Sequence, residues 1–245
     1  SAPTASADYI RDKQWVIDVM NFKKVWSESQ GQGVTVAVVD TGVDGSHPDL
    51  TGQVLEGKDV TGSGGDGQDD TNGHGTGMAS LIAGHGHGAN NSAGVIGLAP
   101  KAKILPIKAA KSNDFNDDQW AEGVRYAVDQ GASVINLSFG DSLATPGSEG
   151  AKAVEYAQQH NVVVVAATGN EGQADLSYPS KLPGVVAVIH HGNRPKIASY
   201  DKDYDDADSA EGSPFRPFYN DRILYSGQPL AMVVATKLEM ARYAG

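Results

Sequence analysis

The sequence predicts an α/β protein in which a mostly parallel β-sheet lies between two layers of helices. Short apolar runs rich in Val and Ile have the composition of strands that are buried on both faces. Segments with helical periodicity separate several of these runs, and this alternation favours parallel strands connected by helices. A length of 245 residues suits one domain of this class, so we expect a single domain over residues 1–245.

Five apolar runs are expected to form the strands of the sheet. They are residues 33–40, 103–109, 132–139, 161–168 and 184–189. Three segments with helical patterns lie between the successive runs from the first to the fourth. These are 75–84, 117–131 and 148–160, the last with Ser148 as its expected N-cap.

Three further segments do not follow this alternation. Gly, Asp and Asn dominate residues 60–73, which predicts a loop. Residues 200–212 form an acidic run without an apolar face, which favours a solvated loop or disordered insert over a cation site. Residues 229–245 are expected to form a final helix with Pro229 in its first turn. We therefore expect 201–245 to be an atypical C-terminal part of the domain.

Composition excludes several classes of function. The net charge of −11 argues against nucleic acid as a partner and agrees with an acidic surface that keeps a secreted protein soluble. There is no cysteine, so neither disulfides nor thiol catalysis can operate. No apolar run approaches the roughly 18 residues of a membrane span. The polar start "SAPTASADYI" is consistent with the remnant of a processed signal or pro-segment.

Candidate site residues follow the strands, because ligands of open α/β sheets bind at the carboxyl ends of the strands. Asp40 ends the first strand, where an Asp is usually a cap or turn residue. His74 lies between two glycines that would let backbone or substrate approach the ring closely. A lone His there is more often structural or a metal ligand, but no H-E-x-x-H pattern supports zinc. Asn170 follows the fourth strand, as a turn residue or as an amide donor to an oxyanion.

Together, several segments resemble the subtilisin-like serine protease family in that family's chain order. They are "VAVVDTGVDGSHPDL", "DDTNGHGTGMASLIAGH", "GVIGLAPKAKILPIKA", "VINLSFG", "VVVVAATGNEG" and "YPSKLPGVVAV". The resemblance extends from about Gln14 to about Tyr200, and within the family it is closest to the actinobacterial mycosin-like branch. It implies a subtilisin-like three-layer fold. A nucleotide-binding domain is disfavoured, because no G-x-G-x-x-G follows the first strand.

The resemblance implies catalytic roles for three residues. Asp40 would orient His74 and support its charge, and His74 would act as general base and then as general acid. The side-chain amide of Asn170 would stabilise the tetrahedral oxyanion, a contribution of about 3 kcal/mol. Catalysis of this kind requires no cofactor.

The resemblance also implies a binding edge for a polypeptide substrate or peptide ligand. Ser138, Phe139 and Gly140 match the edge to which an extended peptide adds as a strand. Ala167 and Gly169 belong to the segment that would wall the primary specificity pocket. Because these residues are small, a medium to large apolar side chain of the substrate is expected there.

A structural calcium ion is a further implication. The segment "NNSAGVIG", residues 90–97, resembles the family's calcium loop. Asp49 and Asn91 would contribute side-chain oxygens, and Ala93 and Val95 would contribute carbonyls. The segment between His74 and Asn91 is longer than in calcium-binding members, so a plain polar turn is the alternative.

The family's nucleophile motif, Gly-Thr-Ser-(Met/Phe)-Ala, is not found. The best match is "SGQPLAM", in which Ser226 takes the place of a non-catalytic serine and Pro229 takes the place of the nucleophile. Proline has no hydroxyl and cannot attack a carbonyl. With Ser226 as the nucleophile instead, the serine would lie before the expected helix and lose the N–H groups of a helix N-terminus.

Two functions from different classes therefore remain. The first is a secreted or envelope-associated serine endopeptidase, whose C-terminal part is rearranged or altered. The second is a catalytically inactive relative that binds peptides or a protein partner through the same cleft. The missing nucleophile motif favours the second, and the joint presence of Asp40, His74 and Asn170 favours the first.

Overall fold

A seven-stranded sheet forms the centre of the molecule. The computed structural model describes residues 9–112, 114–140, 145–169, 177–190 and 231–234. The strands of the sheet have the spatial order β2-β5-β1-β6-β7-β8-β9. Their bounds are Thr35–Asp40 (β1), Lys58–Asp59 (β2), Lys103–Lys108 (β5), Val134–Leu137 (β6), Val163–Ala167 (β7), Val186–His190 (β8) and Ala231–Val234 (β9). All neighbours pair in parallel except β8 and β9, so the predicted mostly parallel sheet is confirmed.

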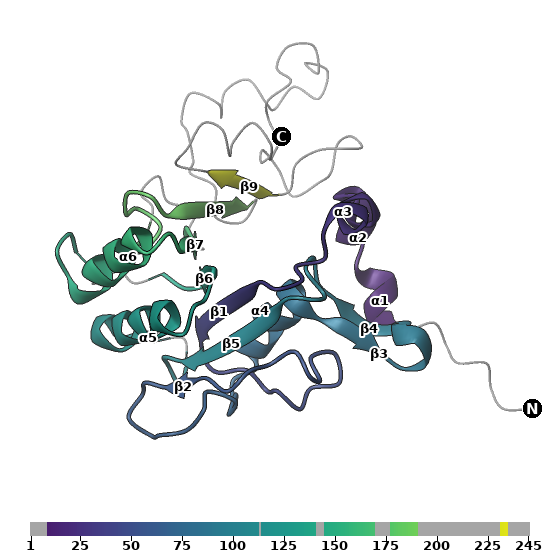
Figure 1. Cartoon of the computed structure of the whole chain (residues 1–245), viewed down its shortest axis with the longest axis horizontal. Helices are drawn as coiled ribbons and strands as arrows, with labels where there is room; N and C mark the ends of the chain where they lie inside the picture. Colours follow the sequence, from purple (N-terminus) through teal and green to yellow (C-terminus); the bar gives the residue numbers. More distant parts are fainter. Residues whose placement is uncertain (1–8, 113, 141–144, 170–176, 191–230, 235–245) are drawn as a thin grey trace, which may run out of the picture.

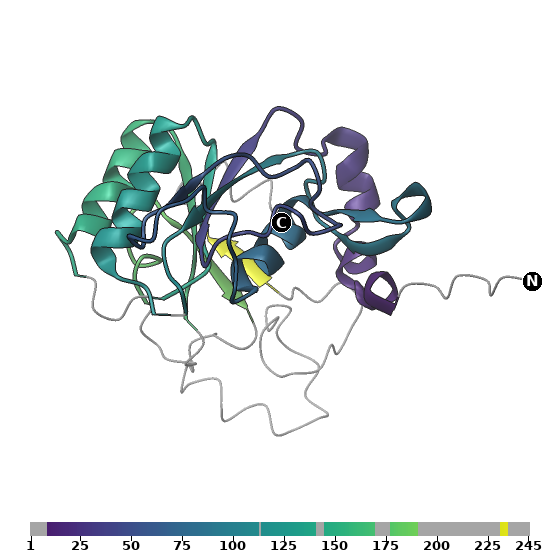
Figure 2. The same ribbon diagram turned by 90° about the horizontal axis from the view of Figure 1, so that it is seen from below.

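Helices cover both faces of the sheet (Figures 1 and 2). On one face lie α5 (Asp117–Asp129) and α6 (Glu149–Gln159), which also pack against each other. On the other face lies α4 (His74–Ala83). The three-layer α/β fold predicted from the sequence is therefore confirmed.

The core has two parts, one on each face of the sheet. Along β1, Ala37 and Val39 face α5 and α6, where they pack in a cluster with the fully buried Trp120. Val36 and Val38 point the opposite way and join a cluster with the α4 residues Ala79 and Ala83. Successive side chains of a strand alternate between the faces, so residues 36–39 of β1 are all apolar because both faces of the strand are buried.

Side-chain caps fix the starts of the two helices on the first face. The side chain of Asn116 accepts hydrogen bonds from the backbone N–H groups of Asp118 and Gln119 at the start of α5. Ser148 accepts a hydrogen bond from the N–H of Ala151 at 3.3 Å, which confirms the predicted N-cap of α6. Caps of this kind pair N–H groups that the first turn of a helix leaves free.

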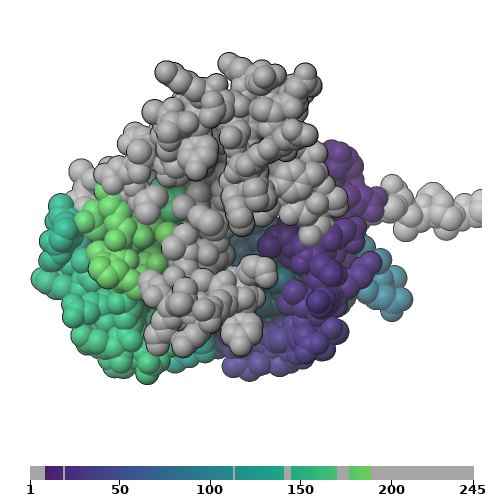
Figure 3. Space-filling view, turned by 90° about the horizontal axis from the view of Figure 1, so that it is seen from above, coloured from purple at the N-terminus to yellow at the C-terminus, as the bar shows by residue number. Residues whose placement is uncertain are grey.

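Residues 9–28 and the hairpin after α4 pack together at one side of the molecule. The N-terminal helices are α1 (Tyr9–Lys13), α2 (Val16–Val19) and α3 (Phe22–Glu28). The hairpin consists of β3 (His85–His87), a short 3₁₀ helix, η1 (Ala89–Asn91), and β4 (Ala93–Ile96). Figure 3 shows the N-terminal residues, in purple, beside the blue residues of this hairpin. The sequence-based prediction assigned no helix or strand to either group, and residues 90–97 were expected as a calcium loop or a polar turn.

One predicted element is wrong. Residues 231–234 were expected within a helix, but they form β9, which pairs antiparallel with β8 from Ala187↔Val234 to His190↔Ala231.

The expected loop over 60–73 is confirmed, because it contains neither helix nor strand. No helix in the described ranges is both long and apolar enough to cross a membrane.

Candidate active site

Asp40 lies at the carboxyl end of β1, in the middle of the sheet. Its side chain is completely buried, and its Oδ1 accepts a hydrogen bond of 2.8 Å from the N–H of Thr41. The backbone carbonyl of Asp40 accepts hydrogen bonds from the N–H groups of Ala109 and Ala110, just after β5. Both the backbone and the carboxylate of Asp40 are therefore held by neighbouring backbone.

His74 is the first residue of α4, and glycines on both sides allow its position. Gly73 precedes the helix with φ of +91°, a conformation that L side chains rarely adopt. Gly75 lies against the turn after β1, where an added Cβ would be 2.1 Å from the carbonyl oxygen of Gly42. The glycines beside His74 were predicted to allow a close approach of backbone. At Gly75 the backbone that approaches is that of Gly42, in the turn after β1.

The structure brings Asp40 and His74 together. Nδ1 of His74 lies 2.7 Å from Oδ1 of Asp40, and the His74 side chain is 35% exposed. The hydrogen bond to Asp40 raises the pKa of His74 above its ordinary value; partial burial acts against this, and the charges of Asp40 and Asp70 add to it. With Nδ1–H donated to Asp40, Nε2 is the acceptor of the neutral ring and can take a proton.

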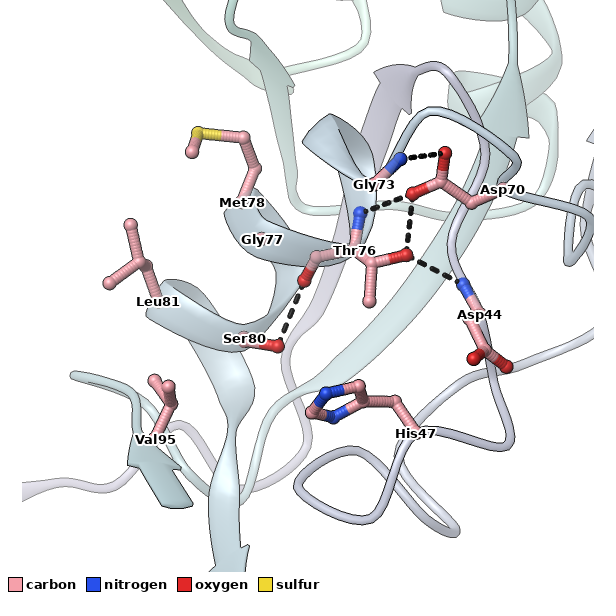
Figure 4. A pocket seen from close by; sticks show the side chains of 10 residues that line it. All are labelled: Asp44, His47, Asp70, Gly73, Thr76, Gly77, Met78, Ser80, Leu81 and Val95. Carbon is pink, nitrogen blue, oxygen red and sulfur yellow. Dashed lines mark hydrogen bonds between the residues drawn. The ribbon is translucent and has the colours of Figure 1, made fainter. Parts of the chain in front are cut away.

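Asp70 fixes the start of α4, a role that the sequence-based prediction missed. Its Oδ1 accepts hydrogen bonds from Thr41 Oγ1 and from the N–H groups of Asn72 and Gly73. Its Oδ2 accepts from the N–H and the hydroxyl of Thr76, and Thr76 Oγ1 in turn accepts from the N–H of Asp44 (Figure 4). Asp70 thereby ties the turn after Asp40 to the helix that begins with His74.

The pKa of Asp70 follows from these contacts. Burial alone would raise it, but the hydrogen bonds from Thr76, the backbone of Gly73 and Thr76, and Thr41 together lower it below the ordinary value. Asp70 is therefore held as a carboxylate near His74. The sequence signal that could have found it is a carboxylate four residues before the helix start, within "DDTNGHGT".

A cavity of about 540 Å³ lies along the outer side of α4 (Figure 4). Met78, Leu81 and Val95 form part of its apolar wall, and His47 and Asp70 contribute polar groups. Neither Asp40 nor His74 lines it. The cavity is thus beside the Asp40–His74 pair and separate from it.

The expected binding edge follows β6, next to β1 in the sheet. Ser138 Oγ accepts a hydrogen bond of 2.8 Å from the side-chain amide of Asn136. The side chain of Phe139 points into the core, where it stacks on Phe115 at a centroid distance of 4.0 Å. Gly140 is exposed. The side chain of Phe139 is therefore not available to a peptide.

The expected pocket wall follows β7, the next strand along. Ala167 ends β7, and Gly169 has φ of +95°. The Ser177 hydroxyl lies between the two segments, because added Cβ atoms at Gly140 and Gly169 would be 2.8 and 3.3 Å from its Oγ. This oxygen is buried and has no hydrogen-bond partner within the described ranges. Ser177 was not among the predicted site residues.

Three of the residues expected at the active site or weighed as the nucleophile, Asn170, Ser226 and Pro229, lie outside the described residues. Within the part of the chain that the structure describes, no hydroxyl forms a hydrogen bond with Nε2 of His74, and no cluster of three or more acidic or His side chains could hold a metal ion.

Asp49 and Asn91, the expected calcium ligands, both lie near the β3–β4 hairpin. Asp49 is buried, and its carboxylate accepts hydrogen bonds from His87 Nδ1 and from the N–H of Val95. The backbone carbonyl of Asn91 accepts a hydrogen bond from Arg11.

An Asp–His pair at the carboxyl edge of a parallel sheet is an arrangement found in hydrolases that use acid–base chemistry. Comparison with known proteins specifies the class. The model of the subtilase family matches residues 31–218, most of the chain. The chain belongs to the subtilase family.

Individual relatives agree with this assignment. Thermitase from Thermoactinomyces vulgaris is 36% identical over 203 residues, covering 80% of this chain and 70% of the relative. The major intracellular serine protease of Bacillus subtilis (strain 168) is 39% identical over 184 residues, covering 70% of this chain and 56% of the relative. The crystal structure of fervidolysin from Fervidobacterium pennivorans, a keratinolytic enzyme, matches with a TM-score of 0.62 at 33% identity, over 76% of this chain and 29% of that chain.

These comparisons support a subtilisin-like serine peptidase. The chain spans between 29% and 70% of the lengths of these three relatives. The family match ends at residue 218, before the segment 225–232 that contains Ser226 and Pro229. Family membership agrees with the expectation that catalysis needs no cofactor and that the partners are peptides.

Proposed function

We propose that this chain is a serine endopeptidase that hydrolyses peptide bonds by acyl transfer. The observation that carries the proposal is the 2.7 Å contact between the completely buried Asp40 and His74. Nε2 of His74 takes the proton of a serine hydroxyl as it attacks the carbonyl and later gives it to the leaving amine. Asp40 keeps the ring in the required tautomer and stabilises the imidazolium that forms.

The substrate is proposed to be an extended polypeptide. It adds as a strand beside Ser138–Gly140, with an apolar side chain directed toward Ala167 and Gly169. The amide of Asn170 is the proposed oxyanion donor.

We further propose that residues 1–245 form one domain, in which residues 201–245 are an atypical C-terminal part. We also propose that the chain belongs to the mycosin-like branch of the family and that it is secreted or envelope-associated.

A second function is favoured by one specific observation in the sequence. In the best register of "SGQPLAM" on the family's nucleophile motif, Pro229 occupies the place of the reactive serine. A chain without that hydroxyl would bind a peptide along the same edge without cleaving it. Such a pseudoprotease would need the binding edge but not the proton transfer by His74.

Labelling by a fluorophosphonate probe, followed by peptide mapping, distinguishes the two functions. The probe reacts with a serine activated by a neighbouring base. The endopeptidase proposal predicts one modified serine in the wild-type chain and none in the His74→Ala variant. A folded wild-type sample without any modified serine would establish the pseudoprotease instead.

A further inference from the structure

The guanidinium of Arg11 lies inside the loop that resembles a calcium site. Arg11 is in α1, and the loop is the β3–β4 hairpin, some 80 residues later in the chain. Nε of Arg11 donates to the carbonyl of Gly94 at 2.9 Å, and Nη2 donates to the carbonyls of Asn91 and Ala93, each at 3.2 Å. Figure 1 shows α1 against β4 and β3. Three backbone carbonyls thus converge on one cation that the chain itself supplies.

The backbone of the hairpin is shaped for this contact. Asn90, Asn91 and Gly94 have φ of 55°, 55° and 73°, a left-handed conformation that Asn and Gly tolerate best. A Cβ added at Gly86 would lie 2.4 Å from Nη2 of Arg11. Because glycine has no side chain, residue 86 leaves room for the guanidinium of Arg11.

The carboxylate expected to bind calcium is also engaged. Oδ1 of Asp49 lies 2.6 Å from Nδ1 of His87, and Oδ2 accepts a hydrogen bond of 2.8 Å from the N–H of Val95. Gly94 packs against this carboxylate so closely that an added Cβ would be 2.0 Å from Oδ1. Both oxygens of the buried Asp49 already have donors.

These residues do not fit a calcium ion. Calcium takes six to eight oxygen ligands at about 2.3–2.6 Å. Here the carbonyl of Ala93, one of the expected ligands, accepts a hydrogen bond from Arg11. The carboxylate of Asp49 is hydrogen-bonded to His87 and to the N–H of Val95. An ion at the carbonyls of this loop would sit next to a guanidinium, and the two positive charges would repel each other.

We propose that Arg11 replaces calcium in this subtilase, so that the N-terminal segment holds the β3–β4 hairpin without a metal ion. Gln14 extends the attachment, since its side-chain amide donates to the carbonyl of Ile96 and accepts from the N–H of Ile96, both at 2.9 Å. The guanidinium suits this task because its planar array of donors reaches several carbonyls at once.

Hydrogen exchange of the peptide spanning residues 86–97 tests the proposal locally. The N–H groups of Val95 and Ile96 are bonded to Asp49 and Gln14, so their exchange reports whether the hairpin is held. We expect the wild-type peptide to exchange at the same rate in millimolar calcium and in excess EDTA. Slowing of this exchange by about tenfold on adding calcium would overturn the proposal.

Variants of the full chain provide the second arm. Arg11→Met is expected to raise the exchange rate of residues 86–97 by about tenfold or more, because hydrogen bonds to a charged donor are lost. Lys13→Met is the matched control, since Lys13 lies in the same helix with its ammonium over the Tyr9 ring, 5.2 Å from the centroid. Arg11→Lys keeps the charge without the planar donors and should give an intermediate rate. Equal exchange in the Arg11→Met and Lys13→Met variants would contradict the proposal.

Discussion

At the scale of single residues, the properties of His74 depend on Asp40. The carboxylate is completely buried and 2.7 Å from Nδ1, whereas the His74 side chain is 35% exposed. Because the hydrogen bond favours the protonated ring, the pKa of His74 is raised above 6.5. The same contact that orients the ring therefore also tunes its basicity.

Asp40→Asn is expected to lower the pKa of His74 toward 6.5, because the charge and the strong acceptor are both lost. An NMR titration of the His74 ring measures this directly. Asp44→Asn is the control, since the Asp44 carboxylate accepts from Ser46 and is not bonded to His74. An unchanged His74 titration in Asp40→Asn would show that the pair is not formed in solution.

The raised pKa of His74 also predicts a dependence of stability on pH. A pKa that is higher in the folded than in the unfolded state stabilises the fold fully below about 6.5, and this contribution is lost as the pH rises through the folded value. The deficit of Asp40→Asn in unfolding free energy should therefore be larger at acidic than at alkaline pH. Urea unfolding across this range measures it.

Residue chemistry was predictable where it depended on local sequence. A strand end and a glycine-flanked helix start marked Asp40 and His74 as candidates only, and the resemblance to subtilisin-like proteases implied that they act as a pair; the structure brings them together. The role of Asp70 was not predicted, because its contacts with Thr41 and Thr76 depend on how the loop folds back over the helix start. Arg11 was missed for a similar reason, since its partners lie 80 or more residues away.

At the scale of elements, α4 depends on Asp70 for its N-terminus. Among the described residues, the Asp70 carboxylate accepts hydrogen bonds from Thr41, Asn72, Gly73 and Thr76. Asp70→Ala should reduce the free energy of unfolding by about 1–3 kcal/mol, since several donors lose a charged acceptor. Because the pKa of Asp70 is lowered, this loss should be present at neutral pH and shrink as the pH falls below 3.8.

Asp66→Ala removes the same charge from the same loop and serves as the control. The Asp66 carboxylate accepts a hydrogen bond from the N–H of Gln68 only, among the described residues. Its replacement should therefore cost clearly less than that of Asp70 in urea unfolding. Equal losses in the two variants would show that Asp70 does not hold α4.

The contact between α5 and α6 depends on the absence of a side chain at Gly150. An added Cβ there would lie 2.0 Å from the ring of the fully buried Trp120. Gly150→Ala should therefore destabilise the fold by about 1–3 kcal/mol. Gly77→Ala, the same change within α4 where an added Cβ meets nothing within 4 Å, should instead stabilise by about 0.5–1 kcal/mol. Thermal unfolding of both variants tests this: the midpoint temperature should fall in Gly150→Ala and rise in Gly77→Ala.

Element boundaries illustrate what sequence can and cannot predict. Helices α5 and α6 were predicted within one or two residues, because their caps and apolar faces are local signals. Residues 231–234 were predicted as helix but form β9, because the antiparallel pairing with β8 depends on a strand more than 40 residues earlier. The two valines of this strand, Val233 and Val234, were the local sign of β preference.

At the scale of the whole molecule, the sheet order brings the candidate groups to one edge. Strands β1, β6 and β7 are neighbours, so the residues that end or follow them lie along one carboxyl edge: Asp40, Ser138–Gly140 and Ala167–Gly169. That the site lies at the carboxyl ends of the strands was predictable from the fold class and from the family resemblance, whereas the spatial order of the strands was not predicted. The nucleophile was not predictable, because the family's Gly-Thr-Ser motif is not found in the sequence.

The most direct test of acid–base catalysis by the Asp40–His74 pair is the rate of fluorophosphonate labelling as a function of pH. Only the neutral His74 ring can accept a proton, so the rate should rise with pH through the raised pKa of His74 and level off above it. The rise should shift to lower pH in Asp40→Asn, with a lower plateau. Labelling that does not depend on pH, or that persists in His74→Ala, would contradict the proposed role of the pair.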